Sequence, residues 1–424
     1  MRQSYRILPV YTGDVSGVCS ALYELGGMVV MHDPSGCNST YNTHDEIRWY
    51  DRDSLIFLSG LTEADAVMGG DDKFIADVAD AADRYQPAFI ALCNSPIPFL
   101  NGTDFDGIAR QIQGRTGIPT FSVPSNGMYD YVRGAGLALE ALAESLFESG
   151  SGWAGSLCGG SAGGRSDGSG PSPGRSAKGK VNILGVTPLD FAADTCAESL
   201  RSFAAGEGWE VTSVWAMGDP LKRLAAAPEA DLNLVVSSVG LPAAEYLHRR
   251  FGIPWTAGVP VGAFRPVLAA AMEEVKGSGN CRAAYLEALG ADPSPAGEKF
   301  ETLAVGEAVL CGSIAAALRL TGEEAYAAAA AGTHLPDQIA PLTGADQFAV
   351  CLGEEEVEDL FGRRAAIAES RGRALRIAAD PMYEWIAPEG ARMVRIPQLA
   401  FSGRVYRNQF PDLMNAEIWR TLWE

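Results

Sequence analysis

Residues 29–37 read VVMHDPSGC and residues 88–93 read AFIALC, and each run passes from apolar residues into a loop at its end. Short apolar runs bounded by loop-forming residues are typical of buried strands. A third such run covers 120–123, and helical patterns cover 72–85 and 132–147. Strands that alternate with helices in this way predict an α/β fold, with βαβ units around a parallel sheet.

A stretch rich in Gly and Ser divides the chain. More than half of residues 151–180 are Gly or Ser, which predicts a flexible linker or a surface insertion. We therefore expect an N-terminal α/β domain over 1–150, a middle α/β domain over 181–300 and a C-terminal α/β domain over 301–424.

Beyond this linker the alternation of strands and helices resumes. The expected strands cover 181–186, 211–215, 232–236 and 253–257 in the middle domain, and 302–305, 348–352, 375–379 and 393–396 in the C-terminal domain. The expected helices cover 243–251, 263–275, 308–320 and 416–423, and the Ala-rich stretch 325–331 is predicted to be helical as well.

The overall composition excludes several classes of function. The formal net charge is −20, so nucleic acid and anionic membrane surfaces, which need clustered Lys and Arg, are poor partners. No window reaches the ~18 apolar residues that a membrane-spanning helix needs. The sequence predicts a cytoplasmic protein, and its eight cysteines are expected to be free, buried or bound to metal rather than paired in disulfides.

Standard nucleotide-binding loops are not found. The nearest approach to a phosphate loop is 174–180, but Val181 stands where a Ser or Thr would bind magnesium, and a linker rather than a strand precedes it. We therefore expect the chain to bind neither ATP nor NAD through such a loop.

Two thiols stand out by position. Cys37 and Cys93 each follow a predicted strand, and the carboxyl ends of parallel strands are where open α/β sheets bind ligands. Thiolates on short loops near backbone amides are the ligands of iron–sulfur clusters, so both residues are predicted to bind a metal cluster. Cys19 and His32 are secondary candidates. The remaining cysteines are expected to be structural: Cys158, Cys196, Cys281, Cys311 and Cys351.

Several segments together resemble the component 1 family of nitrogenases and nitrogenase-like oxidoreductases. The resemblance covers nearly the whole chain outside the linker, and the block 63–73 with its flanking cysteines is its most specific part. The segments that carry it are 33–37, 58–73, Cys93 with Gly102-Thr103-Asp104, 233–236, 251–255 and 379–383.

This resemblance implies three Rossmann-like domains with parallel sheets, and an iron–sulfur cluster of the 4Fe-4S type near a subunit interface. It also implies a homodimer, or a heterodimer with a second component 1 subunit, and electrons supplied by a separate ATP-dependent iron protein. The expected role is a catalytic or electron-transfer component that acts on an unidentified small molecule. Cys37 and Cys93 would be cluster ligands.

The chain also departs from the family pattern. The first cluster cysteine of the family would fall at about Gly13, and Cys19 lies about six residues later. The cysteine that anchors the iron–molybdenum cofactor would fall at Ser237, and no histidine follows His334. We therefore expect neither an iron–molybdenum cofactor nor reduction of dinitrogen. Two alternatives remain open, a metallocofactor assembly scaffold and a cluster-free binding protein of the same fold.

Overall fold

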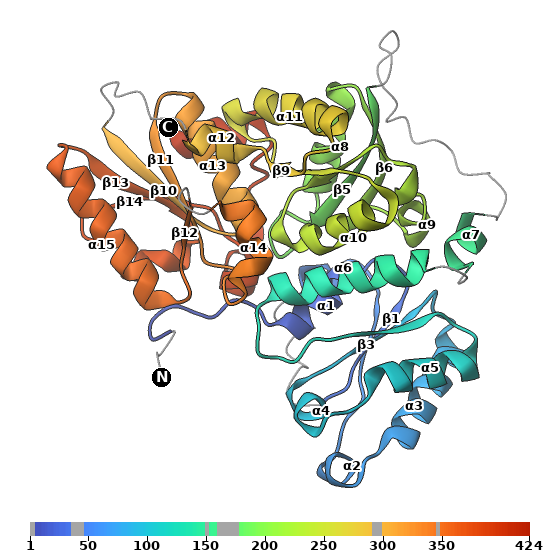
Figure 1. Ribbon diagram of the computed structural model, residues 1–424. Helices are drawn as coiled ribbons and strands as arrows, with labels where there is room; N and C mark the ends of the chain where they lie inside the picture. Colours follow the sequence, from blue (N-terminus) through green and yellow to red (C-terminus); the bar gives the residue numbers. More distant parts are fainter. Residues whose placement is uncertain (1–4, 35–45, 149–151, 159–177, 291–298, 345–347) are drawn as a thin grey trace.

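The computed structural model describes residues 5–34, 46–148, 152–158, 178–290, 299–344 and 348–424 (Figure 1). Its strands form three sheets, each built from one continuous part of the chain, and every pair of neighbouring strands is parallel. The α/β class and the parallel sheets predicted from the alternating pattern are confirmed.

The first sheet has the order β2-β1-β3-β4. Its strands are β1 (Met28–Met31), β2 (Leu55–Leu58), β3 (Ile90–Cys93) and β4 (Thr120–Val123). The helices of this part are α1 (Asp14–Leu22), α2 (Glu63–Met68), α3 (Asp71–Tyr85), α4 (Pro96–Asn101), α5 (Phe105–Thr116), α6 (Tyr131–Phe147) and α7 (Trp153–Cys158).

Helices cover both faces of the first sheet. The apolar side chains of α3 and α5 pack on one face, while α1 and α6 pack on the other and join the core that extends through the whole molecule. In Figure 1, α6 lies between the first sheet and α10 (Leu241–Phe251), a helix of the part of the chain that forms the second sheet.

The second sheet has the order β6-β5-β7-β8-β9. Its strands are β5 (Gly179–Val186), β6 (Trp209–Ala216), β7 (Leu232–Val235), β8 (Trp255–Ala257) and β9 (Arg282–Ala283). The accompanying helices are α8 (Cys196–Gly206), α9 (Leu221–Leu224), α10 (Leu241–Phe251), α11 (Arg265–Ser278) and α12 (Tyr285–Gly290).

The third sheet has the order β12-β11-β10-β13-β14. Its strands are β10 (Phe300–Gly306), β11 (Glu324–Ala329), β12 (Phe348–Val350), β13 (Ala374–Ala379) and β14 (Arg392–Arg395). The accompanying helices are α13 (Ala308–Leu320), α14 (Pro336–Thr343), α15 (Glu354–Ser370), α16 (Leu399–Ser402) and α17 (Ala416–Trp423).

Two local predictions need correction. The Ala-rich stretch 325–331 is not a helix, since most of it forms β11, which pairs with β10 and β12. The predicted linker contains α7, whose Trp153 is buried, and β5 already begins at Gly179. Residues 159–177 of that linker lie outside the described residues, and the domain boundaries stay a prediction.

An early segment of the chain is bound to the third part of the chain, which carries the third sheet and its helices. The carboxylate of Glu354 accepts hydrogen bonds from the backbone amides of Arg6, Ile7 and Leu8, at 2.8, 2.8 and 2.7 Å. A few residues later, the Thr12 amide donates to the Ala400 carbonyl at 2.7 Å. Within the described part of the chain, no helix is long and apolar enough to cross a membrane.

Candidate functional site

The first candidate site lies at the carboxyl edge of the first sheet. Cys93 is the last residue of β3, and its Cα partner in the register is Met31, the last residue of the neighbouring strand β1. Cys37 follows Met31 by six residues and lies outside the described residues. The two strand ends from which the predicted cluster ligands depart are therefore neighbours, as the βαβ pattern predicted.

Cys93 is fully buried, and its thiol faces α1 rather than solvent. Burial raises the pKa of the Cys93 thiol well above its usual range, and a hydrogen bond with the Cys19 thiol raises it further. Cys19 is fully buried as well. The structure thus brings Cys19 next to Cys93, a contact that sequence spacing does not reveal because it depends on how α1 packs on the sheet.

His32 lies on the opposite face of this sheet. Successive side chains of a strand point to opposite faces, and His32 packs with α3 and α5, with its ring stacked on Phe74 at 4.0 Å between centroids. Its Nδ1 lies 2.8 Å from Ser59 Oγ. Burial lowers the pKa of His32 to about 4, so the ring is neutral at ordinary pH. The structure does not bring His32 together with the Cys93 thiol.

Asp14 is a buried residue of this edge that the sequence did not single out. It follows Gly13, where the family's first cluster cysteine would fall, and its carboxylate accepts hydrogen bonds from the amides of Asn126 and Gly127 at 2.9 and 2.8 Å. Burial raises the pKa of Asp14, and these two hydrogen bonds partly offset that rise. Asp14 therefore ties the start of α1 to the loop that precedes α6.

An exposed apolar surface, the α2–α4 patch, adjoins this edge. It consists of Val67, Met68, Phe99 and Leu100, which are 77%, 83%, 45% and 73% exposed. A hydrogen bond from Asn101 Nδ2 to the Ala66 carbonyl at 3.0 Å holds α2 and α4 together. Apolar side chains exposed side by side are typical of surfaces that bind another molecule. Acidic residues lie at the starts of α2 and of the following helix α3: Glu63, Asp65, Asp71 and Asp72.

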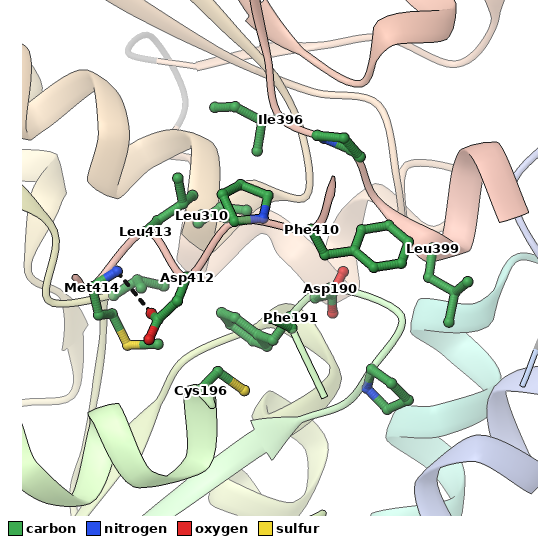
Figure 2. Close-up of a pocket in the computed structure, with 15 residues that line it drawn as sticks. Asp190, Phe191, Cys196, Leu310, Ile396, Leu399, Phe410, Asp412, Leu413 and Met414 are labelled. Carbon is green, nitrogen blue, oxygen red and sulfur yellow. Dashed lines mark hydrogen bonds between the residues drawn. The ribbon is translucent and has the colours of Figure 1, made fainter. Parts of the chain in front are cut away.

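A second candidate site lies where the three parts of the chain meet. Ser237, which stands where the resemblance places the cofactor cysteine, is fully buried, and its Oγ donates to Asp190 Oδ2 at 2.7 Å. Asp190 also lines a cavity with room for about one water molecule, roughly 20 Å³ (Figure 2). Phe191, Phe410 and Met414 supply apolar walls to this cavity.

The residues that the structure describes could supply only some of the ligands of an iron–sulfur cluster. Cys19 and Cys93 give two adjacent thiols, which is the donor chemistry that iron requires. Among the described residues, however, no group of three or more Cys, His, Asp or Glu side chains is placed to hold a metal ion. A complete cluster site would therefore need Cys37 and at least one ligand from outside this set.

A family model and a solved structure both relate this chain to the same protein family. The family model of the nitrogenase component 1 type oxidoreductases matches residues 17–268. The structure of nitrogenase Cp1 at pH 5 superposes with a TM-score of 0.56 over 92% of this chain and 87% of that chain, at 16% sequence identity. The fold is therefore that of nitrogenase component 1, as the resemblance implied.

The proteins of similar sequence include a cofactor biosynthesis protein and a reductase subunit. The nitrogenase iron-molybdenum cofactor biosynthesis protein NifE of Klebsiella pneumoniae is 28% identical over 103 residues, which is 24% of this chain and 22% of that protein. A subunit of the light-independent protochlorophyllide reductase of Gloeothece citriformis is 37% identical over 90 residues, which is 21% of this chain and 18% of that protein. The match spans only about a fifth of the length of these relatives.

Proposed function

Because this chain belongs to the nitrogenase component 1 type oxidoreductase family, we propose that it is the redox subunit of a nitrogenase-like enzyme, with a metal–sulfur cluster bound through Cys37 and Cys93. The observation that carries this proposal is the register of β1 and β3. Met31 pairs with Cys93, so the chain leaves β1 toward Cys37 from a strand end that adjoins Cys93. Cys19, which contacts Cys93, is the candidate for a third thiolate.

A bound iron–sulfur cluster would supply one-electron transfer at this edge. The protein's own residues would prepare the site. Binding of iron would offset the burial that now disfavours the Cys93 thiolate, since a metal ligand must lose its proton. Asp14 would keep the start of α1, and with it Cys19, fixed against the loop after β4.

Analysis of iron and acid-labile sulfide after anaerobic purification tests this assignment. Cys37→Ala and Cys93→Ala should lose most of the iron, while Cys311→Ala and Cys351→Ala should keep it, because those two thiols lie in the third part of the chain. Circular dichroism would confirm that all four variants are folded. Equal iron content in the four variants would remove the basis of the proposal.

The cluster is proposed to be shared between two subunits. A four-iron cluster commonly has four protein ligands, and one chain offers two or three thiols here. A second copy, or a related subunit, would complete the set and match the two-fold symmetry that is usual among oligomers. Anaerobic light scattering should therefore show a dimer, and a monomer that carries a full four-iron cluster would contradict this arrangement.

The α2–α4 patch is the proposed docking surface for the ATP-dependent iron protein. It lies beside Cys93, since α4 begins three residues after that thiol, and its acidic surroundings favour a partner with basic residues around an apolar centre. Met68→Asp should weaken association with the iron protein at least ~10-fold. Leu320→Asp, which alters an exposed leucine on α13, is the matched control and should leave association unchanged.

A cofactor assembly scaffold is the second candidate function. The observation in its favour is Ser237, because a hydroxyl hydrogen-bonded to Asp190 replaces the thiol that would anchor a catalytic cofactor. Similarity to NifE points in the same direction. A scaffold would release its metal cluster to an acceptor protein, whereas a redox subunit would keep its cluster through reduction and reoxidation. Iron content measured before and after incubation with an apo-acceptor separates the two.

A further inference from the structure

Two buried carboxyl groups meet where the three parts of the chain join. Asp190, in the loop after β5, accepts a hydrogen bond from Tyr131 Oη on α6 at 2.5 Å and from Ser237 Oγ at 2.7 Å. Glu307, at the start of α13, accepts hydrogen bonds from the Ser238 amide at 2.8 Å and from the Ser238 hydroxyl. Consecutive serines after β7 thus connect the two carboxyl groups, and the bonds to Tyr131 and to Glu307 cross between parts of the chain.

The described surroundings of this pair offer no compensating positive charge. In the part of the chain that the structure describes, no Lys, Arg or His side chain forms a hydrogen bond or an ion pair with Asp190 or Glu307. The other titratable groups that face the pair are Tyr131 from α6, Tyr285 from α12 and Cys311 from α13, and all three are neutral when protonated.

Two negative charges that interact in a buried site repel each other, and burial separates both from bulk water. A single proton held by the pair removes one of the charges while the hydrogen bonds from both serines remain. Gly185 and Gly240 pack so closely at this junction that a Cβ on Gly240 would lie 2.5 Å from the Leu184 carbonyl oxygen. The backbones of β5 and of the residues after β7 therefore lie in close contact on this side of the junction.

We propose that Asp190 and Glu307 form a proton-binding site that holds the three parts of the chain together around the adjoining cavity, and that loss of this proton loosens the junction. The site is separate from the proposed metal cluster, since the hydrogen bonds of both carboxyl groups go to residues other than Cys93 and Cys19. It also sets the charge of the cavity wall, because Asp190 lines that cavity (Figure 2).

The direction of the pH effect follows from the surroundings of Asp190. Burial and the charge of Glu307 raise the pKa of Asp190 to about 7, although hydrogen bonds from Ser237 and Tyr131 lower it in part. Because the folded state binds the proton more tightly than the unfolded state does, stability is greatest at low pH within this window. It should fall as the pH rises from about 4 through about 7.

Infrared spectroscopy and hydrogen exchange test the proposal on the whole chain. The wild type should show a protonated carboxyl band at pH 6 that disappears by pH 9, and Asp190→Asn should lack the band. Amides of Ser238, Val309 and Leu310 should exchange about 10-fold faster at pH 9 than at pH 6, after correction for intrinsic rates, in the wild type only. The same band and the same acceleration in Asp190→Asn would overturn the proposal.

Two further variants make the result specific. Asp412→Asn alters the other carboxyl of the cavity, which accepts from Ser199 Oγ and the Met414 amide instead, and it should keep the wild-type titration. Tyr131→Phe removes a hydrogen bond that favours the ionised form of Asp190, so it should move the titration upward by about one pH unit. A titration that stays at its wild-type pH in Tyr131→Phe would contradict the assignment even if Asp190→Asn failed to fold.

Discussion

The crossing of α1 and α6 depends on Gly134, and Gly134→Ala should disrupt it. A Cβ at this position would lie 1.8 Å from the Asp14 carbonyl oxygen and 2.4 Å from its carbonyl carbon. Ordinary contacts begin at 3.4 Å, so the two backbones would have to separate by about 1.6 Å to reach that distance. Because both contact atoms belong to the backbone, no side-chain rotation can relieve the clash.

The expected loss of stability can be worked out from these contacts. Overpacking of a close-packed core costs about 1–3 kcal/mol. Displacement of Asp14 would also weaken its hydrogen bonds from Asn126 and Gly127, worth about 1.5–3 kcal/mol each to a charged acceptor. Alanine favours the helix over glycine by about 1 kcal/mol. If half of that hydrogen-bond energy is lost, the net destabilisation is about 1.5–5 kcal/mol.

Thermal unfolding followed by circular dichroism measures the effect. For a unit of this size, 1 kcal/mol corresponds to about 2–4 °C, so the transition of the first part should fall by roughly 10 °C. Gly114→Ala in α5 is the control, because nothing lies within 4 Å of its added Cβ, and this variant should be as stable as the wild type or more so. If Gly134→Ala unfolded at the same temperature as the wild type, α1 and α6 could move apart without loss of stability, and the reasoning would be refuted.

Two further predictions concern ionisable groups. Burial depresses the pKa of His32 from 6.5 to about 4, so the wild type should lose about 3 kcal/mol of stability as the pH falls between these values, whereas His32→Phe should not; parallel urea titrations at pH 7 and pH 4 check this. Burial raises the pKa of Glu354, but the hydrogen bonds from the amides of residues 6–8 outweigh this effect. The pKa of Glu354 is therefore lowered overall. Glu354→Gln should make these amides exchange about 30-fold faster, equivalent to about 2 kcal/mol. Glu358→Gln should have little effect, because Glu358 pairs with the exposed guanidinium of Arg6.

The repeating elements of the fold could be predicted because their signals are local. Apolar runs such as 120–123 and 232–236 are short and bounded by loop residues, and both become strands. The prediction of a helix over 325–331 was wrong because alanine favours a helix in isolation. Here β11 lies between β10 and β12, and pairing with these two strands decides the structure. Small side chains suit a strand that is covered on both faces.

The candidate sites were predictable only in part. The predictions for Cys37 and Cys93 both rest on their positions after apolar runs of the local sequence, and the family resemblance implies the same two ligands. The contact between Cys19 and Cys93 depends on how a helix packs, and the separation of His32 from Cys93 depends on the register of β1 and β3. The pairing of Asp190 with Glu307 joins residues more than a hundred positions apart, and neither could be picked out among 53 acidic residues.

The attachment of residues 6–12 to the third part of the chain has a consequence for folding during synthesis. These residues leave the ribosome well before Glu354, whose carboxylate binds the Leu8 amide and lies 346 positions later. At about 5–20 residues per second, the early segment waits roughly 20–70 s for its partner. During that time the first sheet can form around its own core, while the amides of residues 6–8 stay bound to water. Attachment of this early segment is therefore a late event, because it must wait for the synthesis of α15.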